Sequence, residues 1–208
     1  MLAEVASVAG HAAPFPPETA MNTAPSPLRS PMLAQLLGEL DRIEPRTRAA
    51  VAGLPEAKYR EVPPDGGWSV AQVFEHLCLA NGSYLDGPLP VAIAKAKARG
   101  LSDRPWRPSF VGGWLTRSLV EGAKGMPAPR LYRVGPAPRE QVVDAFLAGV
   151  ARARVLMHEV DGHDLGLGFA SPVSPLFRVN IGDAFRLLVV HSHRHLAQAE
   201  RTRRAVGM

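Results

Sequence analysis

The 208-residue sequence contains a single cysteine, Cys78, and few aromatic residues, which make up 6% of the chain. One cysteine cannot form an internal disulfide, which excludes a disulfide framework and a cysteine-based zinc module and suits a reducing compartment. No apolar run approaches the roughly 18 residues of a membrane-spanning helix, and the first residues lack the basic and apolar regions of a signal peptide. We therefore expect a cytoplasmic protein that does not associate with a membrane.

The sequence also lacks a concentrated patch of one charge. It has 24 Lys and Arg against 19 Asp and Glu, a formal net charge of +5. The basic residues are spread along the chain without interleaved aromatics, whereas nucleic-acid surfaces gather them on one stripe. We do not expect a nucleic-acid partner. A small-molecule substrate is the expected partner, and a homodimer is an open alternative to a monomer.

The composition changes near residue 30. Residues 1–29 are rich in Ala and Pro without periodicity, and such a segment cannot bury enough apolar surface to offset its chain entropy. We expect a disordered tail over residues 1–29. With 46% hydrophobic residues overall, residues 30–208 are predicted to form one domain.

Four segments repeat apolar residues at helical spacing. They cover about 31–53, 70–84, 139–160 and 181–203. Ser30 before Pro31 is a typical helix start, and Ser69 with Gln72 and Asn180 with Asp183 resemble capping boxes. No strand-like alternation competes with these segments, so we interpret residues 166–178 as a loop.

The second and third predicted helices are separated by about fifty residues, from Asp86 to Pro138. This connection alternates Pro and Gly with short apolar pieces, and we expect short helices at 91–98 and 110–119. A connection this long is typical of a crossover that covers one end of a bundle. The predicted fold class is all-α, an antiparallel four-helix bundle with one long crossover between helices two and three.

His191 and His195 lie on the apolar face of the last predicted helix. The inward positions of that helix also include Ile181, Ala184 and Leu188. The i, i+4 spacing places both imidazoles on one face, and buried imidazoles need partners for both ring nitrogens. The pair is therefore a candidate metal site, although it lacks the intervening Glu of HExxH metalloproteases.

His76 lies among apolar positions of the second predicted helix and is the candidate third ligand. Three imidazoles leave a coordination position open, as in catalytic zinc sites. Zinc or nickel is favoured, with iron or manganese as further alternatives. A single histidine on an apolar face is more often a hydrogen-bonded core residue, and this reading stays open for His76.

The other histidines and Cys78 fit structural roles better. His193 is two residues from each member of the pair, about 200° around the helix, and should face away from them. His11 belongs to the tail, and Cys78 suits a small core position. His158 and His163 lie at and after the end of the third predicted helix, where lining a cavity is their less favoured role.

Three motifs together resemble the DinB-like (DNA-damage-inducible, YfiT-like) superfamily. They are Gly67-Trp68-Ser69-Val70 with His76 beyond, Asn180-Ile181-Gly182-Asp183, and His191-Ser192-His193-Arg194-His195-Leu196-Ala197-Gln198. The resemblance covers about residues 30–205. It implies a four-helix bundle that binds a divalent metal through His76, His191 and His195. It also implies a metal-dependent hydrolase, or a transferase or isomerase that uses a low-molecular-weight thiol such as mycothiol or bacillithiol.

The sequence leaves the reaction open. A non-catalytic bundle in which the histidines only tie two helices together is the alternative to an enzyme. No residue is assigned as general base; the candidates are Glu75, Tyr84, Asp86 and His158. Carboxylates that could support the imidazoles from behind are Glu39, Asp41 and Asp144, each of which also fits a solvated surface role.

Helical phase predicts which histidines bind the metal. His191→Ala or His195→Ala should abolish stoichiometric metal binding, because each removes one of the converging imidazoles. His193→Ala is the matched control on the same helix and should keep it. Elemental analysis of the purified variants measures the metal content, and equal loss in all three would overturn the argument from helical phase.

Overall fold

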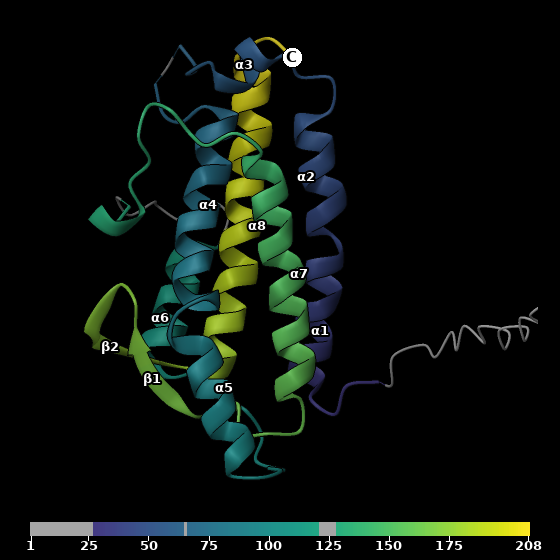
Figure 1. Cartoon of the computed structure of the whole chain (residues 1–208), viewed down its shortest axis with the longest axis vertical. Helices are drawn as coiled ribbons and strands as arrows, with labels where there is room; N and C mark the ends of the chain where they lie inside the picture. The colour runs from purple at the N-terminus through teal and green to yellow at the C-terminus, as the bar shows by residue number, and fades with distance from the viewer. Residues whose placement is uncertain (1–26, 65, 121–127) are drawn as a thin grey trace, which may run out of the picture.

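The computed structural model describes residues 27–64, 66–120 and 128–208, which form a mostly helical protein. Its long axis is followed by α1 (Pro31–Asp41), α2 (Ile43–Val51), α4 (Val70–Leu85), α7 (Val142–Val160) and α8 (Ile181–Ala205) (Figure 1). The shorter helical elements are α3 (Glu56–Arg60), α5 (Pro88–Ala98), α6 (Phe110–Leu119) and the 3-10 helix η1 (Arg130–Tyr132). None of the helices in the described part of the chain is long and apolar enough to cross a membrane.

The first predicted helix is divided in two, which corrects the single helix expected over 31–53. Pro45 has no N–H to bond the carbonyl of Asp41, and its ring crowds that carbonyl. Just before this point, the N–H of Arg42 bonds the carbonyl three residues back, Glu39 O, at 3.2 Å. The helical axis is therefore interrupted between α1 and α2, and Pro45 lies in the first turn of α2, where a missing N–H is tolerated.

The starts of α4 and α8 follow from their caps, as predicted. The Ser69 hydroxyl accepts from Gln72 N, and the Gln72 side chain accepts from Ser69 N. Asn180 and Asp183 form the same reciprocal pair before α8. The start of α7 differs, because Gln141 adopts a left-handed conformation with φ of 50° and the helix begins only at Val142.

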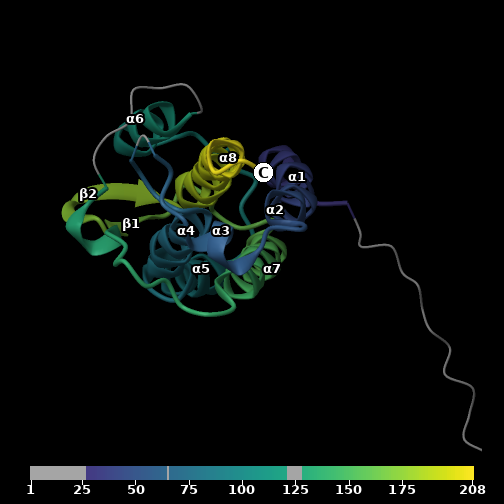
Figure 2. The same cartoon turned by 90° about the horizontal axis from the view of Figure 1, so that it is seen from above.

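The core lies between the long helices, with α8 in contact with α1, α2, α4 and α6 (Figure 2). Phe74 of α4 and Phe146 of α7 are fully buried, with ring centroids 5.6 Å apart. Phe185 and Leu196 of α8 are also fully buried. One apolar face of α8 thus extends along most of its length and holds the helix in a fixed rotation about its axis.

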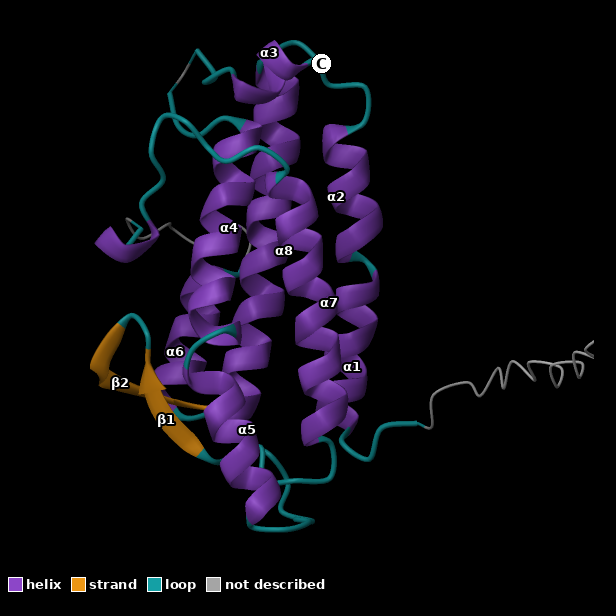
Figure 3. Cartoon of the chain, in the orientation of Figure 1, coloured by secondary structure: helices purple, strands orange, loops and turns teal. Residues whose placement is uncertain are grey.

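A β-hairpin occupies most of the segment that we interpreted as a loop, and it corrects the expectation of no strands. Strands β1 (Gly168–Ser171) and β2 (Ser174–Asn180) pair antiparallel, with Phe169 opposite Val179 (Figure 3). Both of these side chains are buried, whereas Gly168, Ala170 and Arg178 beside them are exposed. The alternation covers too few residues, among Gly, Pro and Ser, to stand out in the sequence.

The crossover is attached to the start of α8. The Trp106 indole donates to the Asn180 side chain at 2.9 Å, and Ser109 N donates to the Asp183 carboxylate at 3.1 Å. Gly112 lies directly against that carboxylate. The predicted short helices of the crossover are present as α5, which begins at Pro88, and α6.

The chain before α1 is described from residue 27. Leu28 packs against the core, and the backbone N–H groups of Arg29 and Ser30 donate to the Asp161 carboxylate at the end of α7. Residues 1–26 of the predicted tail, with His11, lie outside the described residues. The division at residue 30 stays a prediction.

Gly112→Ala should destabilise the protein by about 1–3 kcal/mol, because the added methyl group would overlap the Asp183 carboxylate. That carboxylate is buried and held by backbone N–H groups, so it cannot move aside. Gly113→Ala is the control, since a methyl group there meets only ordinary contacts. Urea unfolding measures both; an unchanged free energy of unfolding in Gly112→Ala would contradict the close contact.

Candidate metal site

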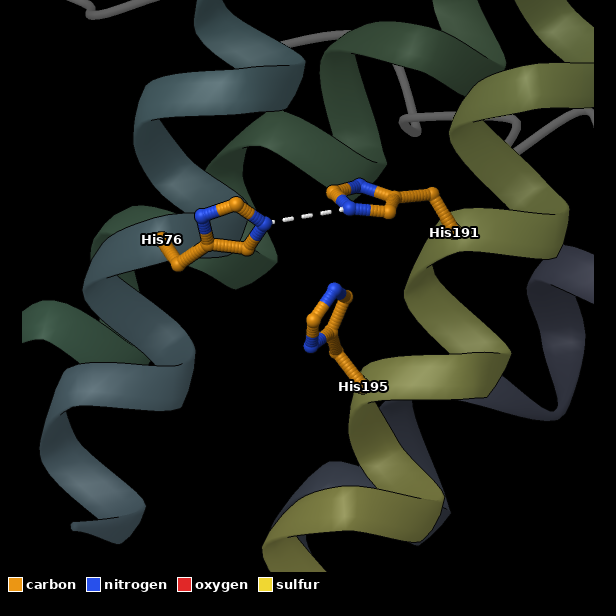
Figure 4. A group of neighbouring side chains, drawn as sticks. All are labelled: His76, His191 and His195. Atoms are coloured by element: carbon orange, nitrogen blue, oxygen red, sulfur yellow. Dashed lines mark hydrogen bonds between the residues drawn. The ribbon is translucent and has the colours of Figure 1, made fainter. Parts of the chain in front are cut away.

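His76 of α4 and His191 and His195 of α8 point toward one another across the interface between these two helices (Figure 4). One ring nitrogen from each lies within 4.8 Å of the others. Nε2 of His76 and Nε2 of His191 are 3.1 Å apart. The predicted convergence of the three histidines is thus present in the structure.

Hydrogen bonds on the outer side of two rings determine which nitrogen faces the centre. His76 Nδ1–H donates to the backbone carbonyl of Tyr132 at 2.9 Å, and His195 Nδ1–H donates to Gln198 Oε1 at 2.8 Å. A neutral imidazole that carries its proton on Nδ1 has a lone pair on Nε2. The Nε2 lone pairs of His76 and His195 are therefore available to a ligand between the rings.

All three imidazoles are held in the neutral form. Burial lowers the pKa of His76, which is 3% exposed, although its bond to Tyr132 opposes the shift. Burial and the nearby His76 lower the pKa of His195 to about 3. His191 keeps some exposure on one side, yet the surrounding protein and the two other histidines lower its pKa well below the usual value.

The donor set fits a divalent transition metal. Two nitrogens that bind zinc at 2.0–2.1 Å in a tetrahedral site lie roughly 3.3 Å apart, close to the separation of His76 Nε2 and His191 Nε2. The ligands must also be unprotonated, and these imidazoles are neutral. Support of a ligating imidazole through its other nitrogen is the usual arrangement in such sites, and Tyr132 O and Gln198 provide it here.

Trp68 and Gln198 also belong to the site; both lie in the motifs that resemble the DinB-like superfamily, but neither was predicted to contact the histidines. The Trp68 ring centroid lies 4.6 Å from that of His76 and 6.0 Å from that of His195, stacked on the latter. The i, i+3 spacing from His195 could have indicated Gln198. The contact of Trp68 with α8 depends on how the helices pack and has no local signal.

The other histidines that the structure describes lie outside the site. His193 faces α1 and α2, where its Nδ1 accepts from Arg46 at 3.1 Å and its Nε2 is 3.4 Å from Glu39. The expectation that His193 faces away from His191 and His195 is therefore confirmed. His158 is exposed on α7, and His163 bonds Gly100 O. Cys78 is half-buried, with its thiol bonded to Val142 O.

The three candidate supporting carboxylates do not reach the imidazoles and take the solvated surface role that the sequence favoured for each. Asp41 pairs with Arg154, Glu39 lies beside Arg42 and His193, and Asp144 is exposed at the start of α7. These side chains stay at the surface because full burial of a carboxylate without a partner is costly. A backbone carbonyl and an amide take their place behind His76 and His195.

Three of the general-base candidates do not face the three converging histidines. Glu75 forms an ion pair with Arg139 at 2.7 Å, Asp86 pairs with Arg152 at 3.3 Å, and His158 is exposed. Tyr84 lies nearer, but burial raises the pKa of its phenol to about 12. Its hydroxyl therefore stays protonated at neutral pH and can donate a hydrogen bond but not accept a proton.

A cavity of about 670 Å³ opens beside the three histidines. Its size lies within the range of about 300–1,000 Å³ typical of small-molecule sites. The described residues that line it come from α4, α6, the β1–β2 hairpin, η1 and α8, together with Trp68. The crossover and the hairpin therefore form the walls of a chamber whose remaining wall carries the imidazoles.

A comparison with protein-family models gives one family for this fold and site. The model described as the DinB superfamily matches residues 39–199, well over half of the chain, and this range includes all three histidines. No curated protein and no solved structure matches the chain.

The neutral histidines predict how the metal-free protein responds to acid. At pH 7 they are neutral in both states; as the pH falls through 6.5, the unfolded chain binds protons that the folded site does not. Stability is therefore lost on acidification, by at most about 1.4 kcal/mol per pH unit for each histidine, down to about pH 3 for His195.

Urea unfolding in the presence of a chelator between pH 7 and pH 4 measures this dependence. His195→Gln should show a shallower fall in the free energy of unfolding than the wild type, because glutamine does not titrate. Equal slopes for the two proteins would contradict the neutral state of His195.

Proposed function

We propose, given that this chain belongs to the DinB superfamily, that it is a metal-dependent enzyme whose His76, His191 and His195 bind one divalent metal. The observation that carries the proposal is the position of three neutral, converging imidazoles in the wall of a cavity. The proposed architecture is the antiparallel four-helix bundle that the family implies. In this bundle, α1 and α2 together form the first helix.

A divalent metal in this site would supply Lewis acidity, which lowers the pKa of a water or thiol and polarises a carbonyl. The chain supplies three ligands, and three leave a position open on the cavity side for a small molecule. His76 and His195 are kept in the required tautomer by Tyr132 O and Gln198. Zinc or nickel suits three imidazoles best, with iron or manganese as alternatives.

The lining of the cavity favours thiol transfer or isomerisation over hydrolysis. No described residue that lines it is a carboxylate, and the phenol of Tyr84 is held protonated. Free water ionises far less readily than a thiol, whose pKa near 8.5 is already close to neutral pH. A thiol thus needs less help from a protein base. We place the reaction in the cytoplasm, where low-molecular-weight thiols stay reduced.

The non-catalytic alternative assigns the metal only a structural role between α4 and α8. It gains support from the same lack of a protein base in the described lining. The cavity beside the histidines favours the enzyme, because a purely structural zinc site is closed by a fourth protein ligand and needs no adjoining chamber.

Parallel assays distinguish these functions. Zinc- or nickel-loaded protein is incubated with mycothiol or bacillithiol and 1-chloro-2,4-dinitrobenzene, and separately with 4-nitrophenyl acetate. We expect conjugation in which the thiol loses its proton, sulfur bonds to the ring and chloride leaves, at a rate that falls to background in His76→Ala and persists in His193→Ala. Hydrolysis alone would favour the hydrolase; metal binding with neither reaction would contradict the enzyme and support the structural role.

A further inference from the structure

The cavity beside the histidines has walls made largely of apolar side chains. Trp114 of α6 and Phe177 of β2 both line it and meet edge to face, with ring centroids 6.5 Å apart. Aliphatic side chains of α6, α8 and the hairpin complete this surface: Leu115, Leu119, Val173, Leu187 and Leu188. Such a surface gains free energy by covering an apolar ligand and gains little from a hydrated one.

Several of the polar side chains in these walls already have partners within the protein, although Asn81 Oδ1 is buried without a hydrogen-bond partner among the described residues. The Tyr84 hydroxyl bonds Ser171 Oγ at 2.7 Å, and the Tyr132 hydroxyl bonds Ser83 Oγ at 2.9 Å. Three further bonds of this kind join Ser118 Oγ to Leu115 O, Asn81 Nδ2 to Ser192 Oγ, and Gln198 Oε1 to His195 Nδ1. Against the Trp114 and Phe177 part of the wall, a substrate group with many hydroxyls would lose bonds to water that these rings do not replace.

The charge in the cavity disfavours a cation. Among the described lining residues there is no Asp, Glu or Lys, and Arg194 carries the formal charge. Aromatic rings such as Trp114 can attract a quaternary ammonium group. A cation that enters here would nevertheless lose hydration without meeting a carboxylate among the described lining residues.

We propose that the substrate has an apolar, uncharged body of ring-like size that packs against Trp114 and Phe177, with one polar reacting group directed toward His76, His191 and His195. Trp114 and Phe177 are then specificity-determining residues, because their rings contact the body of the substrate. That the bound molecule is a substrate rests on the proposed function. The preference for an apolar, uncharged body depends only on the walls of the cavity.

Two nearly isosteric probes test the preference for an uncharged body. They are 4-tert-butylbenzamide and 4-(trimethylammonio)benzamide, which share one amide and differ in the charge of a group of equal shape. Isothermal titration with wild-type protein, metal-free and zinc-loaded, gives both dissociation constants. We expect the neutral probe to bind at least about tenfold more tightly, because the cation is desolvated without a counter-charge. Equal affinities, tighter binding of the cation, or no binding of either probe would overturn the inference.

Matched variants locate the bound probe. Trp114→Ala and Phe177→Ala should each weaken binding of the neutral probe by about fivefold or more, because they remove apolar contact area. The controls are Phe110→Ala, one turn earlier on α6, and Leu176→Ala, the neighbour of Phe177 on β2. Phe110 is 88% exposed, Leu176 is 89% exposed, and neither lines the cavity. Equal losses in all four variants, or no loss in the first two, would place the probe elsewhere and contradict the assignment.

The outcomes separate this inference from the proposed function. Metal content is measured on the same samples, independently of the probes. Protein that binds the neutral probe selectively but takes up no metal would support the apolar pocket and contradict the metal-dependent enzyme. Protein that binds one metal but shows no preference for the neutral probe would support the metal site and contradict the apolar pocket.

Discussion

The candidate site depends on the reciprocal hydrogen bonds between Asn180 and Asp183, which fix the residue at which α8 begins. The rotation of α8 about its axis is then set by its continuous apolar face, and His191 and His195 come to the inner side while His193 faces α1 and α2. The same two capping side chains bind Trp106 and Ser109, so the crossover that forms the cavity wall is attached at the same point.

A second cap has the equivalent role on the opposite helix. Ser69 and Gln72 begin α4, which places His76 two turns along, opposite the pair on α8. Trp68 directly precedes this cap, so the turn that begins the helix also brings the indole against the His76 and His195 rings. Local backbone chemistry at two helix starts thus determines which side chains meet in the centre.

Most of the helices could be predicted from the sequence, because caps and apolar periodicity are local signals. They predict the bounds of α4, α6 and α8 to within a residue or two and select the histidines that converge. The interruption at Arg42 also has a local signal in Pro45. The single helix over 31–53 was predicted from apolar periodicity, which does not register a proline. The β1–β2 hairpin escapes because its alternation is short, and its strands are stabilised by contacts with distant helices.

The surroundings of the imidazoles were less predictable, for a physical reason. The group behind His76 is the backbone carbonyl of Tyr132, 56 residues away, and every residue has such a carbonyl. Carboxylates were the more obvious candidates, but Glu39 and Asp41 find cationic partners at the surface, where their charge stays partly hydrated. Contacts of this kind follow from tertiary packing, and no spacing of residues in the chain indicates them.

The central claim is that three imidazoles bind one metal and leave a position open toward the cavity. X-ray absorption spectroscopy of the zinc-loaded protein measures the number and type of the ligands directly. The account predicts three imidazole nitrogens at about 2.0–2.1 Å and a further oxygen that a small thiol replaces with sulfur. A shell closed by a fourth protein side chain, or one with fewer than three imidazoles, would contradict it.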